Sequence, residues 1–136
     1  MTQPRIVVVG SLNMDVVISM QRMPKIGETV HAEDTHHIPG GKGANQAVGC
    51  RRLDAFVTMV GAVGKDPFGE QLIAQLDEQG VETDRILRVD GAATGTATIF
   101  QTQQDNSIAI VSGANSFCSE NLVDTCKDRI QQADLL

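Results

Sequence analysis

The sequence predicts an α/β fold: a Rossmann-like parallel sheet with flanking helices, together with a small antiparallel β flap. Two apolar runs rich in β-branched residues, 5–9 and 55–61, are typical of buried strands. They alternate with two helix-like segments, residues 44–53 and 66–79, and this order builds parallel βαβ units. Residues 16–38 interrupt the order with two strand-like stretches and no helix between them, so we expect a separate flap there.

A polar pair follows the first strand, which ends at Gly10. Ligands of open α/β sheets bind beyond the carboxyl ends of the strands, and Asn13 and Asp15 occupy this place. Because alternate residues of an extended chain share one face, both side chains are expected to point the same way. A carboxylate beside an amide suits a polyol, since the first accepts hydrogen bonds and the second both donates and accepts them. An Asx-type turn that caps the strand explains the same two residues equally well.

The flap is expected to contain segments from two parts of the chain. Residues 16–20 and 29–38 read as strands, and residues 24–28, Pro-Lys-Ile-Gly-Glu, form a turn signal between them. Residues 84–89 and 94–102 also read as short strands and are expected to join the flap. The flap, or lid, is therefore predicted from about residues 16–38 and 84–102.

A glycine-rich stretch, Gly40-Gly41-Lys42-Gly43-Ala44-Asn45, joins the flap to the helix predicted at residues 44–53. Its glycines permit backbone conformations that side chains forbid, and they let a ligand approach the main chain. The first amides of the helix lack partners and lie at the positive end of its dipole, so they can bind a hydroxylated or anionic ligand. The spacing matches neither a P-loop nor the dinucleotide-binding fingerprint. The alternative is a connector that only turns a strand into a helix.

The second helix has clear boundary signals. Asp66 suits its N-cap, Pro67 suits its first turn, and Gly80 ends it. Its buried side is predicted from an apolar stripe of helical spacing, which comprises Phe68, Leu72, Ile73 and Leu76.

The last third of the chain is expected to return to the core. Residues 106–112 read as another core strand, and this strand runs into Gly113-Ala114-Asn115. A third helix is expected to begin at Ser119, and residues 134–136 look like the start of the next core strand. The side of this helix that faces inward is predicted to comprise Leu122, Val123, Cys126, Ile130 and Ala133.

The composition argues against several classes of protein. The 136 residues suffice for one domain, and the net charge of −6 disfavours nucleic acid or an anionic membrane as a partner, because both require a basic face. No apolar run is long enough to span a membrane. The three cysteines are odd in number and lack C-x-x-C spacing, so we expect a reducing, cytoplasmic location. His31, His36 and His37 lack partners at ligand spacing, and no metal site is expected.

Several motifs together resemble the N-terminal half of the ribokinase family, the phosphofructokinase-B type of sugar kinases. They extend through the whole chain and comprise Gly10-Ser11-Leu12-Asn13-Met14-Asp15, Pro24-x-x-Gly27-Glu28-Thr29, Gly40-Gly41-Lys42-Gly43-Ala44-Asn45-Gln46-Ala47, Gly61-x-x-Gly64-x-Asp66-x-x-Gly69 and Gly113-Ala114-Asn115. Asp54 departs from the signature, which usually has Gly or Ser at this place. Because Asp tolerates left-handed backbone better than most residues, we expect only a small effect on the helix end.

The resemblance implies ATP-dependent phosphorylation of D-ribose at O5 to give D-ribose 5-phosphate. The family's ribose contacts map onto six residues: Asn13, Asp15, Gly41, Lys42, Gly43 and Asn45. The resemblance further implies that Asn13 and Asp15 form hydrogen bonds with ring hydroxyls, while the glycine amides and Lys42 orient the sugar. The flap would close over the sugar as a lid and pair with a second subunit in a homodimer. Another sugar or nucleoside kinase of the same family is the alternative, and the lysine in the glycine loop favours ribose.

The same resemblance implies that residues 1–136 are the N-terminal part of a single domain whose C-terminal, ATP-binding half is absent. The family's catalytic base is an Asp in a Gly-Ala-Gly-Asp motif, and no Gly-x-Gly-Asp occurs in this sequence. No catalytic residue is therefore assigned here. Sites for ATP, Mg²⁺ and a monovalent cation such as K⁺ are expected in the missing half. A non-catalytic sugar-binding fragment is the alternative from a different functional class.

Overall fold

The core of the protein is a parallel three-stranded sheet with the strand order β1-β4-β5. The structure is a computed structural model that describes residues 2–136. The three strands are β1 (Arg5–Val9), β4 (Phe56–Gly64) and β5 (Ile86–Val89). β4 is the central strand, and eight of its nine residues are buried because helices cover both faces of the sheet. The predicted α/β class with a parallel sheet is confirmed.

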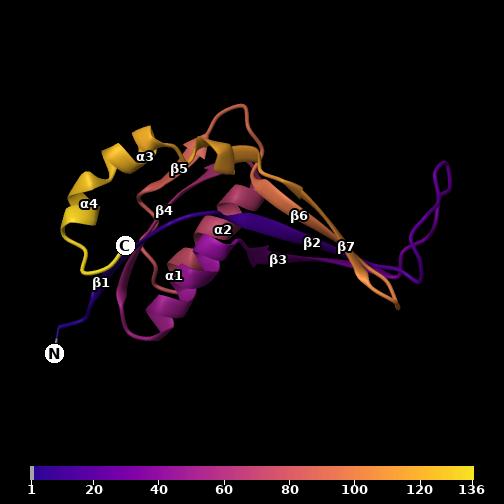
Figure 1. The fold of residues 1–136 in the computed structure, drawn as a ribbon, viewed down its shortest axis with the longest axis horizontal. Coiled ribbons are helices and arrows are strands. Elements are labelled where there is room, and N and C mark those ends of the chain that lie inside the picture. Colours follow the sequence, from indigo (N-terminus) through magenta and orange to yellow (C-terminus); the bar gives the residue numbers. More distant parts are fainter. Residues whose placement is uncertain (1) are drawn as a thin grey trace.

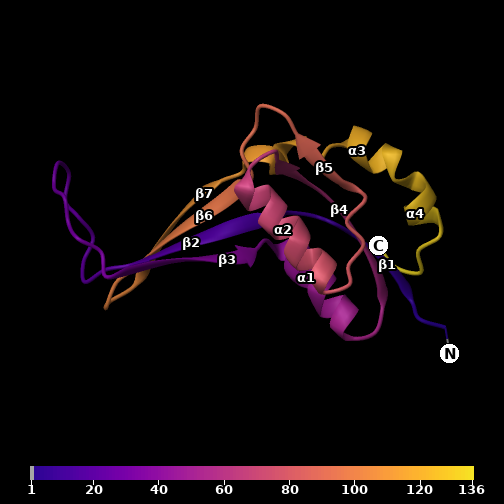
Figure 2. The ribbon, with the colours of Figure 1, turned by 180° about the vertical axis from the view of Figure 1, so that it is seen from behind.

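Helices lie on both faces of this sheet, as Figures 1 and 2 show. On one face, α1 (Lys42–Arg52) and α2 (Pro67–Glu78) pack against Val8 and Met59. On the other face lie η1 (Gly113–Phe117), α3 (Glu120–Thr125) and α4 (Lys127–Gln131). Successive side chains of a strand point to opposite faces, so Val7 and Val60 contact the second helix group.

The ends of α1 and α2 follow the local sequence signals. Asp66 caps α2, because its side chain accepts a hydrogen bond from the Gly69 amide, and Pro67 occupies the first turn. The predicted apolar stripe is confirmed: Leu72, Ile73 and Leu76 are buried, and Phe68 packs against them. Just after α1, Asp54 has φ 64°, which is the left-handed conformation expected for this position.

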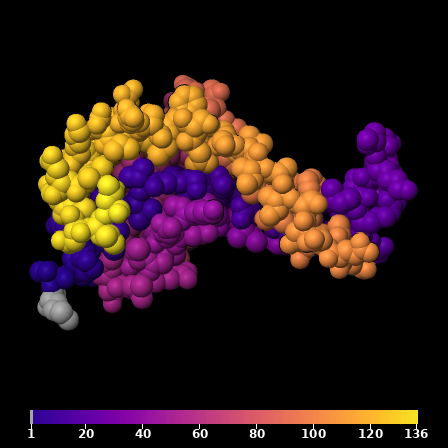
Figure 3. Space-filling model, in the orientation of Figure 1, coloured from indigo at the N-terminus to yellow at the C-terminus, as the bar shows by residue number. Residues whose placement is uncertain are grey.

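A second sheet of four strands projects from the core and forms the lid sheet. Its order is β3-β2-β6-β7, with β2 (Asn13–Ser19), β3 (Asp34–Gly40), β6 (Gly95–Gln101) and β7 (Asn106–Val111). β2 pairs antiparallel with β3 and parallel with β6, while β6 and β7 form an antiparallel hairpin. Figure 3 shows this sheet as an arm that extends away from the helices, with the β2–β3 connection at its far end.

Two strand assignments made from the sequence are wrong. The sequence places residues 84–89 in the flap, but β5 pairs parallel with the core strand β4, with Gly61 opposite Ile86. Ile86 and Val89 are buried there, and these apolar contacts place the strand in the core. The lid contribution of residues 84–102 is therefore limited to β6.

Residues 106–112, which the sequence places in the core, instead form β7 at the edge of the lid sheet. The chain reverses at residues 102–105, where the Thr102 amide donates to the carbonyl of Asp105 at 3.0 Å. So short a connection forces antiparallel pairing with β6, which excludes a place in the parallel sheet. All six residues of β7 are exposed.

The expected third helix is broken into α3 and α4 at Cys126, whose side chain is buried against Val7 and Val60. Three of the residues predicted to face inward, Leu122, Ile130 and Ala133, pack against this cluster. The strand expected at residues 134–136 is present as a single parallel bridge between Leu135 and Ile6.

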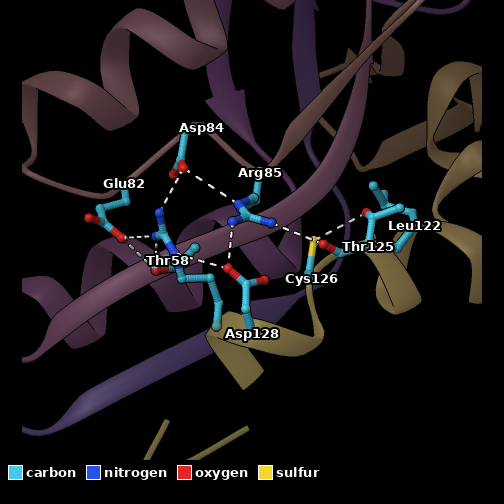
Figure 4. Close-up of polar contacts among 9 residues, drawn as sticks. Thr58, Glu82, Asp84, Arg85, Leu122, Thr125, Cys126 and Asp128 are labelled. Atoms are coloured by element: carbon cyan, nitrogen blue, oxygen red, sulfur yellow. Dashed lines mark hydrogen bonds and ion pairs between the residues drawn. The ribbon is translucent and has the colours of Figure 1, made fainter. Parts of the chain in front are cut away.

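A network of ion pairs fastens α4 to the core sheet, as Figure 4 shows. Arg129 forms a hydrogen-bonded ion pair with Glu82 and donates to Asp84 at 2.8 Å. Arg85 donates to Asp128 at 2.7 Å and to the carbonyl of Thr125 at 3.0 Å. The side chains of Arg129 and Arg85 are 27% and 26% exposed. We assign the network a structural role, because each of its charges has an opposite partner within the fold.

We expect Asp66→Asn to remove an acid-sensitive part of the folding stability. Asp66 accepts hydrogen bonds from the Gly69 amide at 2.8 Å and from the Thr94 hydroxyl and amide at 2.6 and 2.8 Å. Burial raises the pKa of this carboxyl, but the hydrogen bonds outweigh burial and lower it. A lowered folded-state pKa stabilises the fold above the unfolded value of about 3.9, and this stability is lost as the pH falls through the folded value.

Urea denaturation of the unsubstituted protein and of the Asp66→Asn variant, at pH 7 and in the acid range, tests this expectation. The variant should be less stable by about 1–3 kcal/mol at pH 7, and the difference should shrink in acid. Asp90→Asn is the matched control, because the side chain of Asp90 is 89% exposed. A difference that stays constant with pH would show that the charge of Asp66 is not responsible.

Candidate functional site

Asn13 and Asp15 lie at the start of β2, where the chain leaves the carboxyl end of β1 and enters the lid sheet. Both side chains are half-buried, whereas Met14 between them is buried in the core. The alternation therefore places the amide and the carboxylate on one face of β2, as the sequence predicts. The site is located at the junction of the two sheets.

Asp15 has a partly dehydrated and mostly apolar setting. Residues that pair across neighbouring strands share a face, so Asp15 lies on the same face as Ile38, Ala97 and Ile110. Its Oδ2 atom lies so close to Gly40 that a β-carbon there would be 2.8 Å away. Burial raises the pKa of this carboxyl. We call this surface of the lid sheet the Asp15 face.

The glycine loop packs directly on the connection between β1 and β2. Gly41 has φ 95°, and a β-carbon on it would lie 2.6 Å from the carbonyl oxygen of Ser11. A β-carbon on Gly43 would lie 2.8 Å from the α-carbon of Gly10. These glycines are therefore required for backbone-to-backbone contact within the chain. The contact brings the N-terminus of α1 next to the first residues of β2.

Lys42 and Asn45 lie in the first turn of α1, and both are exposed. The first turn holds no acidic residue, so the positive end of the helix dipole is not neutralised from within the helix. Asn45 lines a cavity of about 250 Å³ between α1 and α2, together with Leu12, Gly40 and Arg52. Asn13, Asp15 and Lys42 do not line this cavity.

The structure thus brings Asn13, Asp15, Gly41 and Gly43 together at one junction, with Lys42 and Asn45 on the adjoining helix turn. The arrangement offers a carboxylate as acceptor, an amide as donor and acceptor, a mobile cation and a helix N-terminus. The Asp15 face adds apolar side chains that can cover the C–H groups of a ligand. These groups suit a small polyhydroxylated molecule.

Sequence reasoning did not assign Asn115 or Gly95 to the site. Asn115, in η1, donates through Nδ2 to Oδ1 of Asn13 at 2.7 Å. Gly95, at the start of β6, pairs with Asn13, and a β-carbon on it would lie 2.5 Å from the same Oδ1 atom. The available signal for Asn115 was its position after a strand in Gly113-Ala114-Asn115. Gly95 carries no signal in a single sequence.

His36 and His37 each lie next to another side chain of the protein. His37 packs edge-on against Phe68 of α2 with ring centroids 5.1 Å apart, and His36 Nδ1 lies 4.0 Å from Asp34. Across residues 2–136, no three His, Cys, Asp or Glu side chains are grouped so that they could hold a metal ion. No helix within the same residues has both the length and the apolar character needed to cross a membrane.

Comparison with known proteins identifies relatives of this chain. The model of the pfkB family of carbohydrate kinases matches residues 3–136. The Bacillus subtilis ribokinase is 41% identical over 131 residues, which are 96% of this chain and 45% of that protein. A deoxyribokinase of Salmonella typhi is 36% identical over 132 residues, with 96% and 43% covered.

Solved structures agree with the fold described above. The Arabidopsis thaliana ribokinase complexed with ribose and ATP superposes with a TM-score of 0.76 at 40% identity, over 85% of this chain and 38% of that one. The chain therefore spans less than half the length of the relatives that it matches.

Proposed function

This chain belongs to the pfkB family of carbohydrate kinases, and we propose that it is the sugar-binding half of a kinase that phosphorylates D-ribose at O5. The observation that carries the proposal is the pairing of Asn13 and Asp15 on one face of β2, beside the glycine loop. The chain's similarity to proteins named ribokinase, one of them solved with ribose and ATP, supports the choice of sugar.

In the proposed complex, each element of the site has one role. Asp15 accepts hydrogen bonds from ring hydroxyls, and Asn13 contacts a neighbouring hydroxyl. Lys42, Asn45 and the amides of the glycine loop orient the sugar from the N-terminus of α1. The lid sheet covers the sugar through the Asp15 face and excludes water from it. These contacts fix the sugar while its 5-hydroxyl points away from Asp15.

We assign the ATP, Mg²⁺ and monovalent-cation sites to the part of the relatives' length that residues 1–136 do not cover. When bound, ATP supplies the phosphoryl group. The glycine loop does not fit a triphosphate, because Gly41 and Gly43 pack on the backbone of residues 10–13 and leave no cradle. No residue of this chain matches the family's catalytic base, so positioning the sugar is the only part of the reaction that we assign to residues 1–136.

The experiment uses a chimera in which residues 1–136 are followed by the part of the Bacillus subtilis ribokinase beyond its matched region. Sugar-dependent ADP release is measured with D-ribose, 2-deoxy-D-ribose, D-fructose and a nucleoside. Highest kcat/KM with D-ribose supports the proposal, whereas a preference for one of the others indicates the related kinase. A chimera that binds sugar without turnover would favour a non-catalytic sugar-binding protein.

We also propose a cytoplasmic location, with which the free cysteines agree.

We also propose that the Asp15 face pairs two subunits into a homodimer. On this face, β7 exposes two apolar side chains, Ile108 and Ile110, which are 60% and 67% exposed. Exposed apolar patches of this kind mark interfaces, and β7 leaves an unpaired sheet edge beside them.

Ile110→Asp should therefore weaken dimerisation roughly 10-fold or more. Ala109→Asp is the matched control, because Ala109 is the neighbouring exposed residue on the opposite face of the same strand. Light scattering on the chimera over a range of concentrations measures the effect. A monomeric chimera, or equal weakening by both variants, would contradict pairing through this face.

A further inference from the structure

The carboxamide of Asn115 is held on three sides by the connection between β1 and β2. Its Oδ1 atom accepts from the Leu12 amide at 3.0 Å. Its Nδ2 atom donates to the Leu12 carbonyl at 3.0 Å and to Oδ1 of Asn13 at 2.7 Å. Both hydrogens on Nδ2 therefore have an acceptor within the protein.

The orientation of this carboxamide follows from the chemistry of its partners. A backbone N–H can only donate and a backbone carbonyl can only accept, so Leu12 determines which end of the Asn115 side chain is oxygen and which is nitrogen. The second hydrogen on Nδ2 then points at the Asn13 side chain, and only the oxygen of that side chain can accept it. The amide nitrogen of Asn13 must face the other way.

We propose that Asn115 is a positioning residue that turns the Asn13 side chain so that its NH₂ group faces the ligand. The inference rests on the proposed function for the identity of the ligand as a sugar. It assigns Asn13 the role of hydrogen-bond donor beside Asp15, which is an acceptor. The site therefore recognises two neighbouring hydroxyls, one that accepts from Asn13 and one that donates to Asp15.

Gly95 provides the space that this arrangement requires. It lies beside Asn13 in the parallel pairing of β2 with β6. A β-carbon on Gly95 would be 2.2 Å from Nδ2 of Asn115 and 2.5 Å from Oδ1 of Asn13. Any side chain at this position would separate the two amides.

The position of Asn115 is fixed by the core as well as by Leu12. The preceding residue, Ala114, is fully buried, and its amide donates to the carbonyl of Ala93 at 2.7 Å. Thr94, which follows Ala93 in the chain, is 2% exposed and is hydrogen-bonded to Asp66 at the N-cap of α2. Asn115 is therefore attached to a buried and hydrogen-bonded part of the molecule, as a positioning role requires.

The first test needs no sugar. Asn13→Asp and Asn115→Asp are each made in an Asp15→Asn background, so that either variant has one carboxylate in the site. A carboxylate at position 13 still accepts from Asn115, whereas one at position 115 meets the acceptors of Leu12 and Asn13. Asn115→Asp should therefore lower the melting temperature by roughly 4 °C or more relative to Asn13→Asp. Equal melting temperatures, or the reverse order, would overturn the assigned orientation.

The second test measures D-ribose affinity by calorimetry in the chimera. Asn115→Ala should weaken binding roughly 2- to 12-fold, the range for one neutral hydrogen bond. In an Asn13→Ala background the same change should have less than about a 2-fold effect, because Asn115 acts through Asn13. Ser116→Ala, at an exposed position of the same turn, should leave affinity unchanged.

Two outcomes of the second test have distinct meanings. Additive losses in the double variant would show that Asn115 only supports the fold, and they would overturn its positioning role. Absence of binding of D-ribose and of every other sugar tested would overturn the proposed function and the ligand-facing part of this inference. The melting comparison would still decide the orientation of the two amides.

Discussion

Asp15→Ala should weaken D-ribose binding by the chimera roughly 10- to 150-fold, which corresponds to about 1.5–3 kcal/mol for hydrogen bonds to a charged group. The side chain lies half-buried at the sheet junction, and burial, with no hydrogen bond from residues 2–136, raises the pKa of its carboxylate. We propose that a ligand hydroxyl donates to this carboxylate. Calorimetry with D-ribose measures the loss.

Folding and binding effects of this substitution can be separated. Burial raises the pKa of Asp15 above its unfolded value, so the ionised carboxylate costs stability at neutral pH. Asp15→Ala should therefore leave the melting temperature unchanged or raise it while affinity falls. Asp105→Ala is a control at an exposed position in the β6–β7 turn. Unchanged ribose affinity in Asp15→Ala would refute the assigned role.

The pH dependence of binding provides an independent check. Only the ionised carboxylate accepts hydrogen bonds through both oxygens, so protonation competes with the sugar. Affinity of the unsubstituted chimera should decline as the pH falls, starting at a higher pH than for an ordinary aspartate, because burial raises the pKa of Asp15. Asp15→Asn should bind weakly at every pH and show no such decline.

The parts of the fold that were predicted correctly depend on local signals. Asp66, Pro67 and the apolar stripe of α2 lie within a few residues of one another, and each reports on the helix that contains it. The pair Asn13 and Asp15 was also predictable, because strand alternation alone puts both on one face.

The strand assignments that were wrong depend on contacts between segments that are distant in the sequence. β5 and β7 both read as short strands, and nothing within either segment says which sheet it joins. β5 joined the core because Ile86 and Val89 are buried beside β4, and β7 joined the lid because a tight turn returns it to β6. Asn115 was missed for the same reason, since 102 residues separate it from Asn13 along the chain.

The last expected result concerns the 136 residues alone: with D-ribose, ATP and Mg²⁺ they should release no ADP above background. The proposed sugar contacts lie at Asn13, Asp15, Lys42 and Asn45, but no Gly-x-Gly-Asp occurs in the sequence to supply a base, and the glycine loop does not fit a triphosphate. Proximity does not make Asp15 the base, because the proposed geometry places it on ring hydroxyls remote from O5.

An apolar surface along the edge strand β1 of the core sheet is a second reason to expect that the 136 residues alone are inactive. A cavity of about 510 Å³ lies between α1 and the outer edge of β1, bounded by Val9, Leu53, Leu135 and Leu136. Leu53 and Leu136 are exposed at 84% and 69%, and an open strand edge with apolar neighbours favours association and partial unfolding. Joining the C-terminal portion of the Bacillus subtilis ribokinase should cover this surface and restore ribose-dependent turnover. Turnover by the 136 residues alone, abolished by Asp15→Ala, would show that the catalytic machinery lies within them.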